Sequence, residues 1–187
     1  MNNSVILQDL AQASTVVGDL VDRITTDQWT APTPCTDWNV REIVSHLVGI
    51  NLVFVAMFEG GPMPQRGTDV LGLDPAAAYR TSASVLQAAA AEPGVLDRSQ
   101  ETVLGAASGA ERVQWRILDL LVHGWDLVEA TGVEVELPAD LAEKSLTFAL
   151  IHLPNQPRAG RFADPIAISE AALPIDRLAA FTGRSVP

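Results

Sequence analysis

Four segments of the chain carry apolar residues at helical spacing, and this pattern constrains the fold more than any other feature. It predicts helices at about residues 4–24, 39–60, 75–91 and 110–130. Strand signals are few: a short hairpin near ETVLGAASG and a short strand at PIAI. The sequence therefore predicts an all-α protein, most simply a four-helix bundle with peripheral additions.

The chain is short enough for one domain. Its 187 residues are 48% hydrophobic, which suits one compact unit with a sizeable core. We expect residues 1–187 to form a single domain with its core at about 4–151, which includes a shorter helix at about 139–151. Residues 152–187 are expected to pack on the bundle as a tail, with a last helical turn or two near 173–181.

Charge and composition exclude several classes of partner. The chain has 12 basic and 23 acidic residues, a net charge of -11, and no cluster of Lys and Arg, which argues against nucleic acid and anionic membranes. The most hydrophobic run, residues 43–58, is short for a membrane span and contains His46 and Asn51. No signal-peptide pattern opens the chain, and the single Cys35 cannot form an intrachain disulfide. We expect a cytoplasmic protein.

The helix ILDLLVHGWDLVEATG (residues 117–132) is apolar on nearly every side, yet it contains Asp119 and His123. These residues are four positions apart, so they project from one helix face about 6 Å apart along the axis. An unpaired carboxylate among leucines would cost several kcal/mol or take up a proton. The pair therefore needs a partner.

His46 is a matching anomaly in the second helix, and it can converge with Asp119 and His123 if the two helices pack. Two imidazoles and a carboxylate are a common ligand set for a divalent metal. A hydrogen-bonded core histidine beside a buried Asp–His pair fits the spacing as well, so both interpretations stand. Glu42 competes as a ligand but also sits where a capping box needs it. Asp126 is either an acceptor that orients His123 or a solvated residue.

Other candidate residues carry weaker signals. His152 follows an apolar patch and either packs there or lines a pocket, and Arg158 and Arg161 either bind an anion or lie in solvent. Cys35 in TPCTDW is more typical of a packed residue than of a nucleophile. The sequence has no phosphate-binding loop, and GAASGA is not a nucleophile elbow.

Three motifs make the chain recognisable: TPCTDWNVREIVSHLVG, DLLVHGWDLVEATG and RLAAFTGRSVP. In this order they resemble the mycothiol-dependent maleylpyruvate isomerase-like proteins of the DinB superfamily, over nearly the whole chain. The resemblance is closest to a single-domain, metal-binding subfamily. It implies a DinB-like bundle that holds zinc or nickel through His46, Asp119 and His123. Family enzymes often have Glu or His in place of Asp119, and the characterised isomerase has a further C-terminal domain, so its own reaction is not expected here.

Two classes of function follow. The first is an enzyme, a metal-dependent thiol transferase that uses mycothiol or a related small thiol against a small electrophile, with metal-assisted hydrolysis as a variant. In this class Arg158 or Arg161 would receive a substrate carboxylate. The second is a non-catalytic bundle that senses or carries a small ligand, with a structural metal or none. Its broad helix faces make a homodimer plausible.

Overall fold

The computed structural model describes residues 2–65, 67–102, 105–155, 158 and 162–187, and it is mostly helical. This confirms the all-α fold class. The helices are α1 (Asn3–Val21), α2 (Val40–Glu59), α3 (Pro75–Ala91), α4 (Gly109–Thr131), α5 (Ala139–His152) and α6 (Pro174–Phe181), with short 3-10 turns at Gln28–Thr30 and Leu153–Asn155.

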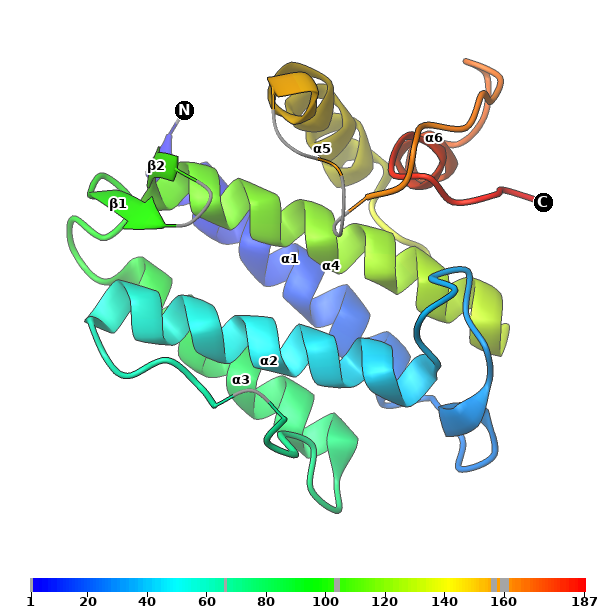
Figure 1. Cartoon of the computed structure of the whole chain (residues 1–187), viewed down its shortest axis with the longest axis horizontal. Coiled ribbons are helices and arrows are strands. Elements are labelled where there is room, and N and C mark those ends of the chain that lie inside the picture. Colours follow the sequence, from blue (N-terminus) through cyan, green and yellow to red (C-terminus); the bar gives the residue numbers. More distant parts are fainter. Residues whose placement is uncertain (1, 66, 103–104, 156–157, 159–161) are drawn as a thin grey trace.

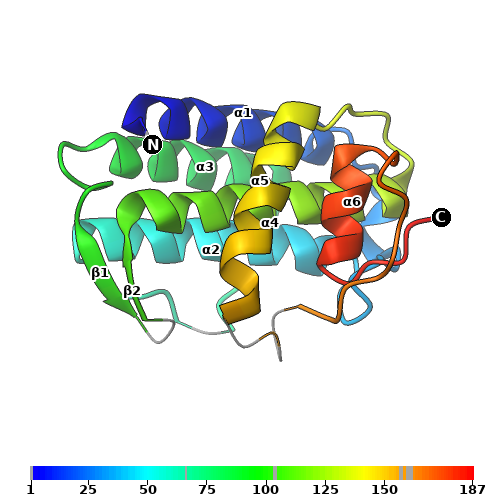
Figure 2. The same cartoon turned by 90° about the horizontal axis from the view of Figure 1, so that it is seen from above.

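Helices α1 to α4 form the predicted bundle. In Figure 1, α2 and α3 lie side by side as one pair and α1 and α4 as the other, and α1 also packs on α3. Helices α5 and α6 run across the outside of α4, as the view in Figure 2 shows. This places α4 between the bundle and the C-terminal segment, so its side chains contact both.

Local sequence signals set the helix ends. Helix α2 begins with a complete capping box: the Asn39 side chain accepts from the Glu42 backbone N–H (3.0 Å), and the Glu42 carboxylate accepts from the Asn39 N–H (2.8 Å). Ser108 caps α4, and Gly132 ends it in the left-handed conformation (φ 66°), which glycine adopts without steric cost. The ends of α2 and α4 are thereby fixed.

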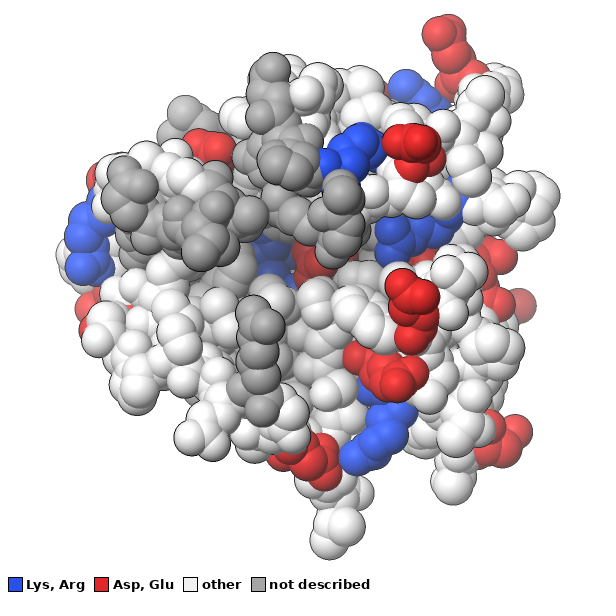
Figure 3. Space-filling view, viewed as in Figure 1, with Lys and Arg blue, Asp and Glu red and all other residues white. Residues whose placement is uncertain are grey.

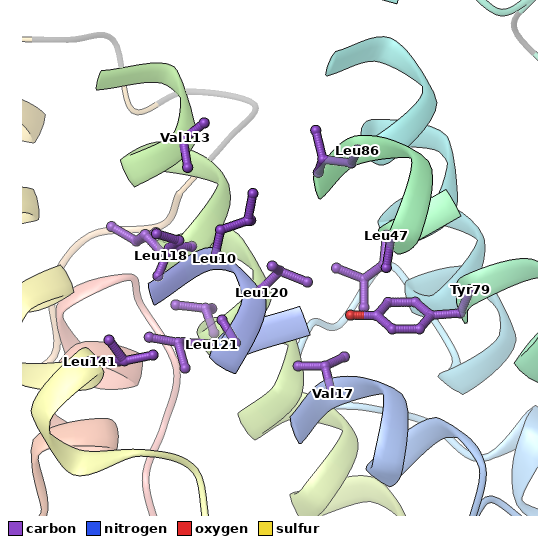
Figure 4. Close-up of a cluster of buried hydrophobic side chains, with 14 of the residues drawn as sticks. Leu10, Val17, Leu47, Tyr79, Leu86, Val113, Leu118, Leu120, Leu121 and Leu141 are labelled. Carbon is purple, nitrogen blue, oxygen red and sulfur yellow. The ribbon is translucent and has the colours of Figure 1, made fainter. Parts of the chain in front are cut away.

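Leucines and valines, mostly from α1, α2, α3 and α4, fill the core, and α5 adds Leu141. Figure 4 shows side chains from α1, α2 and α3 meeting those of α4, with Leu120 and Leu121 in the middle. Both leucines are fully buried. Burying a leucine contributes roughly 1.5–3 kcal/mol, so these contacts hold α4 firmly in place.

One polar network runs through this apolar core. Asn51 of α2 donates to Ser82 of α3 (2.9 Å) and accepts from Arg116 of α4 (2.9 Å). Tyr79, one turn from Ser82, donates its hydroxyl proton to the Ser14 carbonyl of α1 (3.2 Å). Burial raises the pKa of Tyr79, so it stays a neutral donor. The network links all four bundle helices.

The regions outside the bundle differ in part from expectation. The predicted hairpin is present as strands β1 (Ser99–Thr102) and β2 (Gly105–Ser108), paired antiparallel. The strand predicted at PIAI is wrong: residues 165–168 form neither helix nor strand, and Ile166 makes one backbone hydrogen bond to Ala180. A single bond to a helix end gives no neighbouring strand to pair with.

The surface charge and the hydropathy of α2 are relevant to two possible partners, nucleic acid and membrane. On the face shown in Figure 3, Lys and Arg side chains lie beside Asp and Glu rather than in a continuous basic patch. Among the described residues, α2 is the one helix long and apolar enough for a membrane span, with a mean hydropathy of 1.6. The core helix of a bundle meets the same criteria, and α2 packs on α3 and α4.

Candidate metal centre

His46, Asp119 and His123 converge at the contact between α2 and α4. The Oδ1 atom of Asp119 lies 3.2 Å from Nε2 of His46 and 3.6 Å from Nε2 of His123. The two imidazole rings meet edge to face, with centroids 4.9 Å apart. The helix contact thus supplies two nitrogens and one oxygen within 4.8 Å of one another.

These distances fit a zinc-type ion. Zinc bonds of about 2.0–2.1 Å in a tetrahedral arrangement place neighbouring donor atoms about 3.3 Å apart. The observed 3.2 and 3.6 Å lie on either side of that value. The donor set of two imidazoles and one carboxylate also suits zinc and nickel. The residues present therefore fit such a metal.

Asp119 is held as an ionised carboxylate with its two oxygens in separate environments. Oδ1 faces the histidines, and Oδ2 accepts a hydrogen bond from Nη1 of the buried Arg116. Burial favours the protonated acid, but the contacts with His46, His123 and Arg116 outweigh it and hold the pKa of Asp119 well below its ordinary range. Only Oδ1 is open toward the cluster.

His123 is oriented by Asp126, one turn further along α4. Its Nδ1 lies 2.9 Å from Oδ2 of Asp126, whose side chain is 0% exposed. Burial raises the pKa of Asp126, but hydrogen bonds from His123 and Arg184 outweigh it and lower the pKa. Since the ionised carboxylate can only accept, Nδ1 of His123 carries a proton and donates it to Asp126, which directs Nε2 toward Asp119.

Arg184 ties the C-terminal segment to this arrangement. Its guanidinium donates to both oxygens of Asp126, at 3.1 and 2.8 Å. The preceding helix α6 is anchored close by, where Nε1 of Trp125 donates to Asp176 (2.9 Å). The segment after α5 therefore supports His123 through Asp126.

Trp38 and Cys35 border the cluster from the loop before α2. The Trp38 ring lies 4.7 Å from the His46 ring and 5.6 Å from the His123 ring, measured between centroids. The Cys35 sulfur lies within 4.8 Å of donor atoms of His123 and Asp126. Burial raises the pKa of Cys35 despite the nearby Arg184, so it is a neutral thiol at neutral pH.

The remaining candidate residues lie elsewhere. Glu42 caps α2, and Asp126 is buried rather than solvated. His152 lies 3.7 Å from Glu111, which is in the first turn of α4 and away from the cluster. Arg158 donates to the carbonyls of Ala163 and Phe181, which gives it a structural contact, and its proposed role toward an anion stays a prediction. Arg161 lies outside the described residues.

Sequence reasoning missed Arg116 and Arg184. Arg116 had one available signal: it lies three positions before Asp119 in an otherwise apolar helix, the spacing of a helical ion pair. Arg184 lies in the closing motif, but its partner is 58 positions away. No local pattern announces such a contact.

The fold and the cluster define a DinB-like helical bundle with a histidine–carboxylate centre between α2 and α4. The chain belongs to the family of the mycothiol maleylpyruvate isomerase N-terminal domain, whose model matches residues 10–128. That match includes all three residues of the cluster.

Two sequence relatives and two solved structures are similar to most of the chain. Two uncharacterized proteins, from two strains of Mycobacterium tuberculosis, are each 34% identical over 170 residues, covering 89% of this chain and 91% of the relative. The crystal structure of the mycothiol-dependent maleylpyruvate isomerase and that of a mutant have TM-scores of 0.60 and 0.61 at 12% and 11% identity. Each match covers 78% of this chain and 68% of the isomerase, and at this identity it shows the shared fold.

Proposed function

We propose that this protein binds a divalent metal through His46, Asp119 and His123 and uses it to activate a small thiol of the mycothiol type against a small electrophile. The observation that carries the proposal is the convergence of two imidazole nitrogens on one carboxylate oxygen. The family supports thiol-dependent transferase or isomerase-like chemistry. Such chemistry suits the cytoplasm, where small thiols are kept reduced.

The residues of the chain have separable tasks in this proposal. The two histidines and Asp119 hold the metal, and a bound divalent metal lowers the pKa of a thiol so that the nucleophilic thiolate forms near neutral pH. Asp126 keeps the proton of His123 on Nδ1, which leaves Nε2 available as a metal ligand. Trp38 packs against both imidazoles on one side of the cluster.

The direct test uses protein purified without an affinity tag and loaded with Co²⁺ as a spectroscopic substitute for zinc. Adding mycothiol is expected to produce a sulfur-to-cobalt absorption band in the wild type and in His152→Ala, but not in His123→Ala. A second assay uses absorbance to follow conjugation of the thiol to a chromogenic aryl chloride on the zinc-loaded protein. We expect conjugation by the wild type and His152→Ala, and none by His123→Ala.

Each contrary result has a clear meaning. Wild-type protein that retains neither zinc, nickel nor cobalt refutes the metal centre. Protein that retains metal but shows no sulfur band with mycothiol refutes the thiol chemistry and favours the alternative, a non-catalytic bundle with a structural metal. An equal band in His123→Ala refutes the assignment of the site.

A further inference from the structure

Arg116 is the most completely buried positive charge among the described residues, and it touches Asp119 directly. Its side chain is 0% exposed. Its Nε donates to Oδ1 of Asn51 (2.9 Å), its Nη2 to the Leu47 carbonyl (2.8 Å) and its Nη1 to Oδ2 of Asp119. Three nitrogens of one planar group thus have three different acceptors on α2 and α4.

This arrangement fixes the guanidinium before any ligand arrives. Asn51 is itself held by Ser82 of α3, so the anchor is part of the bundle's polar network. A planar group fixed at Nε and Nη2 cannot turn its Nη1 away from Asp119. The orientation of the Asp119 carboxylate is therefore set by the core of the bundle as well as by its own helix.

The hydrogen bond from Arg116 engages one of the two carboxylate oxygens of Asp119. A free carboxylate can bind a cation through both oxygens, and larger oxygen-preferring ions use this mode to reach higher coordination numbers. Oδ2 is already engaged by Arg116, which leaves Oδ1 alone beside the two histidines. A site with one oxygen and two imidazole nitrogens suits zinc better than manganese.

Charge cannot provide this selectivity. Asp119 is paired with Arg116, and Asp126 with Arg184, so each acidic side chain at the cluster has its own buried or nearly buried cation. The formal charge of the two pairs is zero before a metal binds. Discrimination between two ions of equal charge must then depend on the type and number of donor atoms.

We infer that Arg116 is a positioning residue that restricts Asp119 to one-oxygen coordination, and so makes the centre select a zinc-type ion over a manganese-type ion. This inference rests on the proposed metal centre. It adds a determinant of metal choice that lies outside the ligand set and is built into the bundle core.

The test compares metal preference in Arg116→Lys and Arg116→Met with the wild type. Arg80→Lys is a matched control, because Arg80 also pairs with carboxylates but lies on the surface with Asp19 and Asp22. Dissociation constants for Zn²⁺ are measured by chelator competition and for Mn²⁺ by electron paramagnetic resonance. The Co²⁺ absorption spectrum reports coordination number independently of any activity, and circular dichroism checks folding.

Arg116→Met is expected to reduce the preference for zinc over manganese by about tenfold or more, the size expected for an outer-sphere partner of a metal site. Its Co²⁺ bands should weaken as the coordination number rises. Arg116→Lys should show a smaller change in the same direction, and it decides the question if the methionine variant does not fold. Arg80→Lys should match the wild type.

Two outcomes overturn the inference, and they are distinguishable. If the wild type binds zinc at this site but a folded Arg116 variant keeps the same metal preference and Co²⁺ spectrum, the positioning role is wrong and the proposed function stands. If the wild type binds no divalent metal, the proposed function fails and this inference with it.

Discussion

Helix α4 makes two kinds of histidine–carboxylate contact, and their surroundings differ. In the middle of the helix, Asp119 meets His46 and His123 beside the fully buried Arg116. At its N-terminal end, about 12 Å away by the helical rise, Glu111 faces His152 at 3.7 Å. Both side chains of that second pair are about one-third exposed.

The comparison shows what turns a contact into a candidate centre. At the Glu111 end, one imidazole meets one carboxylate beside a cavity of about 390 Å³, and solvent screens the pair. At the Asp119 turn, two imidazoles meet the carboxylate. Asp126 fixes the His123 ring, and Arg116 fixes the Asp119 carboxylate. The two regions therefore differ in the number of side chains that meet and in the hydrogen bonds that hold those side chains in place. They do not differ in the type of contact, which joins histidine to a carboxylate in both.

Removing one histidine from each region should produce the largest difference between the two regions, and the difference is in zinc affinity. His123→Ala is expected to weaken zinc binding by more than about 100-fold, because outer-sphere partners alone contribute about 10–100-fold. His152→Ala should leave it unchanged. Chelator competition measures both, and equal losses in the two variants would remove the distinction between the regions.

Stability should separate the regions next. Asn51→Ala leaves Nε of the buried Arg116 without its acceptor, and we expect the free energy of unfolding to fall by about 2–3 kcal/mol. Glu111→Gln breaks only an exposed pair and should change it by less than about 1 kcal/mol. Urea denaturation of the metal-free proteins gives both values, and a tolerated Asn51→Ala would show that the network does not fix Arg116.

Weakening the hydrogen bond between His123 and Asp126 should reduce zinc affinity by a smaller factor than removing His123. Asp126→Asn should weaken zinc binding by about 10–100-fold, because the amide oxygen is a weaker acceptor for the Nδ1 proton than the carboxylate. Isothermal titration calorimetry in a competing buffer measures the change. An Asp126→Asn variant with wild-type affinity would mean that Asp126 serves only to dock Arg184.

Cys35 gives the mildest test, since it reports how buried the surroundings of the cluster are. The pKa of its thiol is raised, so alkylation by iodoacetamide should be slow at pH 7.5 and should still be accelerating above pH 9. The urea-unfolded chain, with the same single cysteine, should react near the ordinary thiol pKa of about 8.5. A folded protein that reacts like the unfolded chain would show that this loop is open to solvent.

Local chemistry explains which features the sequence could predict. The capping box at Asn39, Pro75 at the start of α3 and Gly132 after α4 act within one helical turn, so the helix bounds follow from them. Asp119 and His123 were expected on one face because helical spacing fixes it. Their meeting with His46 required only that α2 and α4 pack together.

What the sequence could not predict depends on contacts between distant segments. Arg184 reaches Asp126 only after the C-terminal segment has crossed α4, and Trp38 reaches the two histidines through the fold of the loop before α2. The strand expected at PIAI failed for a related reason, since a strand needs a neighbouring strand that local residues cannot supply. Tertiary packing decides all three.

The most direct measurement is a zinc-edge anomalous difference map from crystals of the zinc-loaded protein. We predict one strong peak about 2.0–2.2 Å from Nε2 of His46, Oδ1 of Asp119 and Nε2 of His123, with Oδ2 of Asp119 still bound to Arg116. A peak between Glu111 and His152, a peak at Cys35, or no peak at all would contradict the assignment of the metal centre.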